Sequence, residues 1–237
     1  KGESGWGANR IADKDPRLTL GDRKMPLSAR NANTMWMLHF LAHLKDGGTA
    51  GFVMATGELS NGETARLEVR QALVDLDYVD CIVQLTNQLF ANTAIPCSLW
   101  FLSKNRSGGN GYRKRTGEVL YIDARRLGKL IQDFRRQKEL SGEDIAAMST
   151  VYRTFRTGIG NVESPGFAAV GTLEEIRQHG YSLTPGRYVG TADDSDLDAD
   201  FAEVLPGILR QLNEDFDRGA HLVASIRGKL SKVSRAD

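Results

Sequence analysis

The sequence predicts an α/β fold built on a doubly wound sheet, and three observations indicate it. Short apolar runs rich in Val, Ile, Leu and Trp alternate along the chain with segments of helical periodicity. Each run is too short for a free helix and is apolar at consecutive positions, which is typical of strands buried on both faces. The 237 residues, 41% of them hydrophobic, suffice for one sizeable domain with an appendage.

The N-terminal part of the chain is predicted to be irregular and then helical. Residues 1–30 are rich in Gly and charged side chains and show no sustained period. A first helix follows, with Asn31 or Asn33 as its N-cap. His39 and His43 have the four-residue spacing of a metal pair, but no third ligand accompanies them. Solvent-side or helix-end histidines are therefore the favoured interpretation, and we expect no metal site.

The central part of the chain supplies the strands of the predicted sheet. Thr49–Ala55 is expected to be a buried strand, and Glu63–Asp77 a helix whose apolar residues recur at helical spacing. Asp80–Leu85 and Cys97–Leu102 are two further strands. Because only a short loop separates them, they are predicted to form an antiparallel hairpin at one side of the sheet. Glu118–Asp123 is expected to be the last strand.

The loop inside this hairpin is the first candidate site. It holds the aromatic Phe90 among Asn87, Asn92 and Thr93, and it closes with Ile95-Pro96, where proline belongs at the start of a strand. Polar groups around one exposed aromatic suit a flat ligand with a hydrogen-bonding edge. From spacing alone, a connecting loop whose Phe90 packs into the core is the favoured interpretation.

Charge is unevenly distributed although the net charge is only +1. Residues 104–156 contain thirteen Lys or Arg against six acidic residues, so this third of the chain is suited to polyanions. Within it, the adjacent cations Arg113, Lys114 and Arg115 form a turn that suits contact with phosphate. A solvated loop of the same composition is the commoner case.

The two cysteines and the hydropathy bear on the location of the protein. Cys81 and Cys97 both lie inside apolar runs, which favours buried free thiols in a reducing cytosol over a disulfide or a metal site. No apolar run approaches the length of a membrane span, and no signal peptide is visible. We therefore expect a cytoplasmic protein.

The last third is predicted to be helical. Ser141–Phe155 and Thr172–His179 each begin with Ser or Thr followed three residues later by an acid, the pattern of a capping box. Tyr181–Gly190 is expected to be extended around a Pro-Gly turn. Asp193–Asp200 has the acidic, polar composition of a linker. An amphipathic helix follows, interrupted by Pro206 and two glycines.

This final helix needs a partner for its apolar stripe. It either folds back on its own domain or docks on a partner helix. The expected domains are residues 1–125, half of an α/β domain; 126–192, a helical and extended extension; and 193–237, a linker and partner-binding helix. The expected partner-binding residues are Leu205, Ile208, Leu212 and Phe216.

Taken together, these segments resemble the modification (M) subunit of type I restriction-modification systems, an adenine-N6 DNA methyltransferase. The matching segments, in order, are Asn31-Ala32-Asn33 before the helix MWMLHFLAHLKDGG, then GFVMATGELS, EVRQALVDLDYVDCIVQLTNQLFANTAIPCSLWFLSK, VLYIDARRLG and TLEEIRQHGYSLTPGRYVG. The resemblance implies a class I methyltransferase sheet that binds S-adenosylmethionine, and an Asn-Pro-Pro-Phe/Tyr loop for the flipped adenine. Neither that loop nor the Gly-rich cofactor motif occurs here, so both are expected upstream of Lys1. We therefore expect a C-terminal half-domain that holds no catalytic residue and is inactive alone.

The resemblance also assigns roles to the candidate residues. It implies that Phe90 forms a stacking wall of the target-base pocket, which Asn87, Asn92 and Thr93 line. DNA and a specificity (S) subunit are the implied partners, the S subunit meeting the C-terminal helix, and whether a restriction (R) subunit joins them is left open. The alternative is a non-catalytic module with an α/β fold that binds proteins and DNA. A start codon immediately upstream of Lys1 would favour this alternative.

Overall fold

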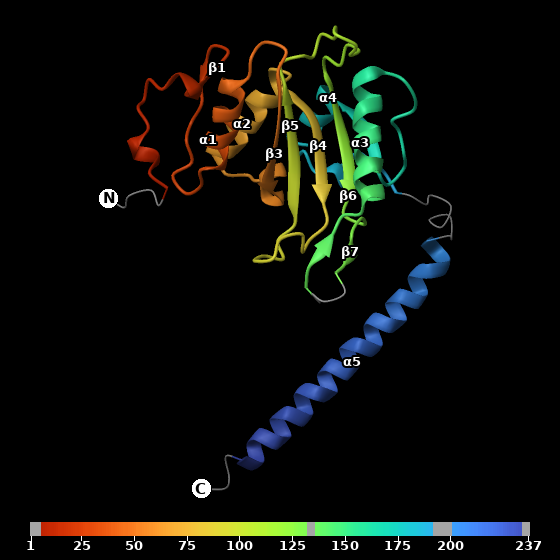
Figure 1. Cartoon of the computed structure of the whole chain (residues 1–237). Helices are drawn as coiled ribbons and strands as arrows, with labels where there is room; N and C mark the ends of the chain where they lie inside the picture. The colour runs from red at the N-terminus through yellow and green to blue at the C-terminus, as the bar shows by residue number, and fades with distance from the viewer. Residues whose placement is uncertain (1–5, 132–135, 192–200, 234–237) are drawn as a thin grey trace. The chain divides into compact units, whose positions relative to one another are not determined.

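The structure, a computed structural model, describes residues 6–131, 136–191 and 201–233. These residues belong to two compact units, 1–192 and 193–237. The first unit is a mixed sheet with helices, and the second contains one long helix (Figure 1). The predicted linker Asp193–Asp200 lies outside the described residues.

The main sheet has five strands in the order β3-β5-β4-β6-β9. Their bounds are β3 Thr49–Ala55, β4 Val79–Leu85, β5 Cys97–Ser103, β6 Glu118–Ala124 and β9 Ala168–Thr172. β4 and β6 are parallel, whereas β5 is antiparallel to both of its neighbours and β9 is antiparallel to β6. Strands β3, β4 and β6 therefore run in one direction, and their carboxyl ends meet at one edge of the sheet.

The predicted β4–β5 hairpin is confirmed, with Val83 opposite Leu99. Its expected place at one side of the sheet is wrong, because β5 also pairs with β3, with Gly51 opposite Phe101. A strand with so many large apolar side chains is suited to the interior of a sheet, where both of its edges are paired.

The expectation that Glu118–Asp123 is the last strand is also wrong. β9 follows it and pairs with β6, Leu120 lying opposite Val170. Because β9 extends the same sheet, residues 126–192 are part of the first unit and not a separate extension. The small residues of β9, Ala168-Ala169-Val170-Gly171-Thr172, give it no apolar run by which the sequence would reveal it.

Four helices pack in the first unit: α1 Asn33–His43, α2 Thr64–Asp75, α3 Gly142–Thr157 and α4 Leu173–Gln178. The predicted asparagine cap of α1 is wrong, because Ala32 occupies the N-cap; the Asn31 side chain instead accepts from the backbone N–H of Asn33 at 2.7 Å. The capping boxes of α3 and α4, headed by Ser141 and Thr172, are both formed. The short elements are η1 Ala8–Arg10, η2 Pro16–Leu18, β1 Thr19–Leu20, β2 Arg23–Lys24, η3 Thr56–Leu59, β7 Lys129–Leu130, β8 Lys138–Glu139 and η4 Pro185–Arg187.

Helices cover both faces of the sheet, which gives two apolar cores. One core joins α1, α2 and α4 to the sheet through residues such as Leu38, Leu73 and Trp100. The other lies under α3 and includes Val83 and Phe155. No residue of β3 belongs to this second core, so the face of β3 on that side is open.

β3 is therefore not the buried strand that the sequence predicts. Val53 is 51% exposed, and Gly51 and Ala55 are also exposed. β3 lies at the end of the strand order, so no described strand pairs with its outer edge.

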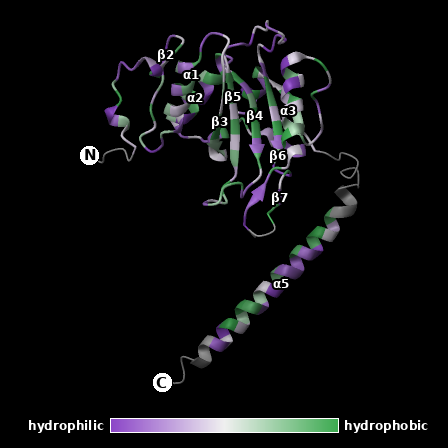
Figure 2. Ribbon diagram, viewed as in Figure 1, coloured by the Kyte–Doolittle hydropathy of each residue, from purple (hydrophilic) through white to green (hydrophobic). Residues whose placement is uncertain are grey.

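The second unit contains helix α5, Phe201–Val233, which is continuous over 33 residues. The predicted interruption at Pro206 is wrong, because α5 runs through this residue, which lies in its second turn. Apolar and polar residues alternate along α5 with helical period (Figure 2). None of the described helices, this long one included, is apolar enough to cross a membrane.

Candidate nucleic-acid interface

The loop between β4 and β5, residues 86–96 (the Phe90 loop), carries the four predicted base-pocket residues on the surface. Phe90 is 46% exposed, and Asn87, Asn92 and Thr93 are exposed beside it. The interpretation from spacing alone, in which Phe90 packs into the core, is therefore wrong. The loop presents an accessible aromatic face among side chains that both donate and accept hydrogen bonds.

Local hydrogen bonds give this loop its shape. The backbone N–H of Thr93 donates to the carbonyl of Phe90 at 3.4 Å, and the Thr93 hydroxyl accepts from the N–H of Ile95 at 3.1 Å. Gln88 has a φ of 61°, a left-handed conformation that turns the chain immediately after β4. These contacts occupy the backbone and leave the Phe90 ring free.

The Phe90 loop lies at the carboxyl edge of the sheet. The Thr56 hydroxyl, just after β3, donates to the carbonyl of Pro96 at 2.7 Å, which joins the end of β3 to the end of the loop. The hairpin of β7 and β8, which follows β6, lies at the same edge (Figure 1). The carboxyl ends of strands are where open α/β sheets bind ligands, so the loop occupies the expected position for a site.

The predicted phosphate-contact residues lie at the opposite edge, because the loop that holds them leads into the start of β6. Arg115 is wrong as a phosphate contact: its side chain is fully buried, and its Nε donates to Asp80 at 3.0 Å. Arg113 pairs with Glu118 at 2.5 Å and also donates to the carbonyl of Phe155. Of the three, only Lys114 has an exposed side chain, and that side chain forms no hydrogen bond or ion pair with the described residues.

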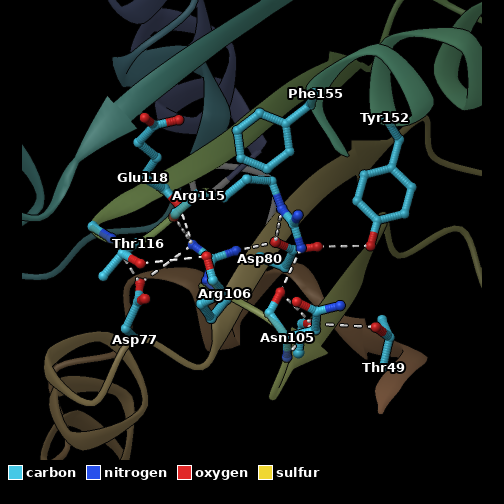
Figure 3. Close-up of polar contacts among 12 residues, drawn as sticks. Thr49, Asp77, Asp80, Asn105, Arg106, Arg115, Thr116, Glu118, Tyr152 and Phe155 are labelled. Atoms are coloured by element: carbon cyan, nitrogen blue, oxygen red, sulfur yellow. Dashed lines mark hydrogen bonds and ion pairs between the residues drawn. The ribbon is translucent and has the colours of Figure 1, made fainter. Parts of the chain in front are cut away.

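These arginines belong to a buried network that the sequence reasoning missed (Figure 3). Asp80 has no exposed surface and accepts from three donors, which are Arg106 Nη1, Arg115 Nε and the Tyr152 hydroxyl at 2.9 Å. Arg106 also pairs with Asp77 at 3.3 Å. The signal that reveals the network in the sequence is Asp80 itself, because a carboxylate inside an apolar strand needs a charged partner.

The network perturbs the groups within it. Burial lowers the pKa of Arg106 and of Arg115, because it penalises the charged guanidinium. The pKa of Tyr152 rises to about 12, chiefly through burial. The network joins β4, the β5–β6 loop and α3, and it faces away from the Phe90 loop, so its role is structural.

The histidine pair on α1 is accounted for by local hydrogen bonds. His43 Nδ1 lies 2.8 Å from the carbonyl of His39, and His39 Nδ1 lies 3.1 Å from Arg17 Nη1. Within the described ranges, no group of three His, Cys, Asp or Glu is placed to hold a metal ion.

The carboxyl edge does not fit a nucleoside cofactor by itself. Glu58 follows β3, and Asp123 lies near the end of β6, which runs in the same direction. At these positions a carboxylate would accept hydrogen bonds from ribose hydroxyls. Glu58 is buried and is paired with Arg66, and Asp123 is paired with Arg125 at 2.5 Å. Both carboxylates are thus occupied.

The predicted partner-binding residues on α5 form an exposed apolar stripe. Phe216 is 65% exposed and Leu212 46%; Ile208 is also exposed, and Leu205 partly so. Exposed apolar residues in such number on one helix are typical of a surface that binds a partner.

Solved structures identify the class of fold. A methyltransferase subunit of a type I restriction-modification system from Streptococcus thermophilus superposes with a TM-score of 0.60 at 28% identity, covering 74% of this chain and 33% of that one. The EcoKI M protein gives 0.53 at 17% identity, over 78% and 43%, a likeness of fold. The sheet is therefore part of a class I methyltransferase sheet, as the resemblance implied.

The sequence comparisons define the family. The N-6 DNA Methylase family model matches residues 2–197. The HindI methylase subunit of Haemophilus influenzae is 36% identical over 225 residues, 95% of this chain and 48% of that protein. The MjaIX methylase subunit of Methanocaldococcus jannaschii is 44% identical over 197 residues, 82% and 34% respectively. The chain belongs to the N-6 DNA methylase family, and it spans a third to a half of the length of these relatives.

Proposed function

We propose that this chain is the C-terminal half of the catalytic domain of a type I modification subunit, which transfers a methyl group from S-adenosylmethionine to N6 of adenine in DNA. The observation that carries the proposal is the exposed Phe90, placed with polar side chains at the carboxyl edge of a sheet of this family.

The chemistry of adenine explains why such a loop is needed. The exocyclic amine is a weak nucleophile, and inside a duplex it is out of reach, so the base has to be extruded and held beside the methyl donor. A flat aromatic side chain holds an extruded base by stacking on its face. We assign this role to Phe90, and we assign to Asn87, Asn92 and Thr93 the hydrogen bonds that line the pocket.

The proposal places the cofactor outside the residues of this chain. Two features support this: Glu58 and Asp123 are occupied by arginines, and no strand among the described residues pairs with the outer edge of β3. S-adenosylmethionine supplies the methyl group, and this chain supplies the base-stacking side of the pocket. The chain alone is therefore expected to be inactive.

The proposed partners are DNA and the specificity subunit, which selects the target sequence. We assign the apolar stripe of α5 to the specificity subunit, because a helix this amphipathic is suited to a helical partner. Replacing Leu212 and Phe216 by Asp should abolish co-purification with that subunit while the first unit stays folded; Glu214→Gln is the matched control. Retention of the complex would place the partner surface elsewhere.

The free, buried thiols of Cys81 and Cys97 support a cytoplasmic location.

The test of the base pocket uses the complete modification subunit assembled with its specificity subunit. Loss of base stacking costs roughly 1–3 kcal/mol, so Phe90→Ala should lower kcat/KM by about 5- to 150-fold. Phe90→Trp should retain most of the activity because it keeps a stacking face. Ile95→Ala, which removes another exposed apolar side chain of the same loop, is the matched control and should have little effect.

Two outcomes would contradict the assignment. If Phe90→Ala is as active as the parent and as stable, Phe90 does not contact the base. If the assembled parent transfers no methyl group to adenine, the proposed activity is wrong and the interaction-module alternative is favoured.

A further inference from the structure

We propose that Arg126, Lys129, Arg136 and Lys138 (the carboxyl-edge cations) form a binding surface for the DNA phosphates that flank the extruded base. The inference rests on the proposed function and adds to it the surface that holds the DNA backbone. It replaces the phosphate contact predicted at residues 113–115, which lie at the other edge of the sheet.

The four cations come from one segment of the chain. Arg126 follows β6, Lys129 and Lys138 belong to β7 and β8, and Arg136 lies between these two strands. All four therefore come from the segment that leaves the carboxyl end of β6, on the same side of the sheet as the Phe90 loop (Figure 1).

The β7–β8 hairpin is bonded directly to the Phe90 loop. The backbone N–H of Lys138 donates to the carbonyl of Gln88 at 2.8 Å, and Lys138 Nζ donates to the Thr86 hydroxyl at 3.0 Å. Gln88 is two residues from Phe90. Lys138 is thus held beside the Phe90 loop, and the pairing of β7 with β8 holds Lys129 on the same hairpin.

Three of these cations are open to solvent. The side chains of Arg126, Lys129 and Arg136 are exposed and form no hydrogen bond or ion pair with any residue that the structure describes. The nearby acids are largely engaged: Asp123 pairs with Arg125, and Asp144 accepts from the backbone N–H of its capping box.

Glu139 is exposed and lies opposite Lys129 in the β7–β8 pair, and Glu143 at the start of α3 is exposed as well. The charge of Lys129 also helps to lower the pKa of Asp144. Among the described residues of 123–144, five Lys or Arg stand against four Asp or Glu, so this segment carries a small excess of positive charge. At the other edge, in contrast, Arg106, Arg113 and Arg115 are bound to carboxylates.

The requirement of the reaction supplies the last step. Extruding a base rotates its nucleotide about the backbone, so the phosphates on either side have to be held while the base enters the pocket. Lys and Arg contacts to phosphate fix the register of a protein on the duplex without reading its sequence. Exposed cations on the segment that is bonded to the Phe90 loop meet this requirement, and sequence selection stays with another part of the enzyme.

The experiment measures binding of the assembled modification and specificity subunits to a duplex of about 30 base pairs that carries the methylated site mapped for that enzyme. The variant is Arg126→Gln with Lys129→Gln and Arg136→Gln, and the matched control is Lys114→Gln, an exposed unpaired cation at the opposite edge. Each lost phosphate contact lowers the salt dependence of log K by about 0.9, so the triple variant should lose a slope of nearly three. The control should keep the parent slope.

The result that overturns the inference is a triple variant that is folded, judged by its melting temperature, and that binds with the parent affinity and salt slope. A loss of slope of about 0.9 in Lys114→Gln, which is the same loss per removed charge, also overturns it, because the effect would then be one of net charge. Failure of the parent to methylate adenine refutes the proposed function separately. If Phe90→Ala loses activity while the triple variant binds normally, only the phosphate surface is refuted.

Discussion

Replacing Asp80 by alanine tests the buried network, and its expected cost follows from the contacts. The carboxylate is fully buried between two guanidinium groups. Without it, Arg106 keeps Asp77 at 3.3 Å, but Arg115 keeps only carbonyl acceptors, at 2.9 Å on Arg113 and 2.7 Å on Asn105. Breaking a buried ion pair from one side costs about 3–5 kcal/mol, because the remaining charge stays buried without a partner. We expect Asp80→Ala to lower the free energy of unfolding by an amount in this range, which is a large part of the stability of a typical domain.

The assay is urea unfolding followed by circular dichroism, with the free energy of unfolding taken from the midpoint and slope. The decisive variant combines Asp80→Ala with Arg115→Met. Because the second change removes the orphaned charge and keeps an apolar side chain of similar length, the pair should be more stable than Asp80→Ala alone. A cost below about 1 kcal/mol for the single variant, or no recovery in the double variant, would refute the reasoning.

Three further predictions concern pH, packing and the cofactor. Burial raises the pKa of Tyr152 to about 12, from 10, so the folded protein holds this proton more tightly than the unfolded chain. The contribution of protonated Tyr152 to the free energy of unfolding should be fully present below pH 10 and be lost as the pH rises to 12. The fall should be less steep in Tyr152→Phe, and parent and variant urea midpoints that change identically with pH would contradict this. A Cβ at Gly171 would lie 2.8 Å from Tyr121, which stacks on Tyr188 at 3.8 Å, so Gly171→Ala should cost about 1–3 kcal/mol and lower the melting temperature. Gly207→Ala, which meets open space, is the control and should not destabilise. Calorimetric titration of the 237-residue chain with S-adenosylmethionine should give no saturable heat, and tight binding would contradict the assignment of the cofactor outside it.

Much of the fold is predictable because its central strands carry strong local signals. The apolar runs that become β4 and β5 are bounded by Asp77 and Pro96, and their predicted limits agree with the structure within a residue. The strand order is not available from such signals: that β5 lies between β3 and β4 depends on pairing across more than 40 residues. β9 was missed because alanine and glycine carry no periodic pattern.

The candidate site was only partly predictable, for a related reason. The polar composition around Phe90 suggests a surface for a flat ligand, whereas spacing alone favours a ring packed into the core; the exposure of Phe90 contradicts the second interpretation. Arg113, Lys114 and Arg115 look equivalent in the sequence, yet one is buried, one is paired and one is free. What separates them is Asp80, 35 residues from Arg115, and no local pattern reports a partner at that distance.

The open edge of β3 has a consequence for handling the protein. Its sequence, Thr-Ala-Gly-Phe-Val-Met-Ala, holds neither a charge nor a proline, the usual means by which edge strands avoid pairing with other chains. The outer face near Val53 is apolar as well. A preparation of the 237-residue chain by itself is therefore prone to edge-to-edge self-association, and a lysine at position 53, pointing to solvent, is the change that would keep it monomeric.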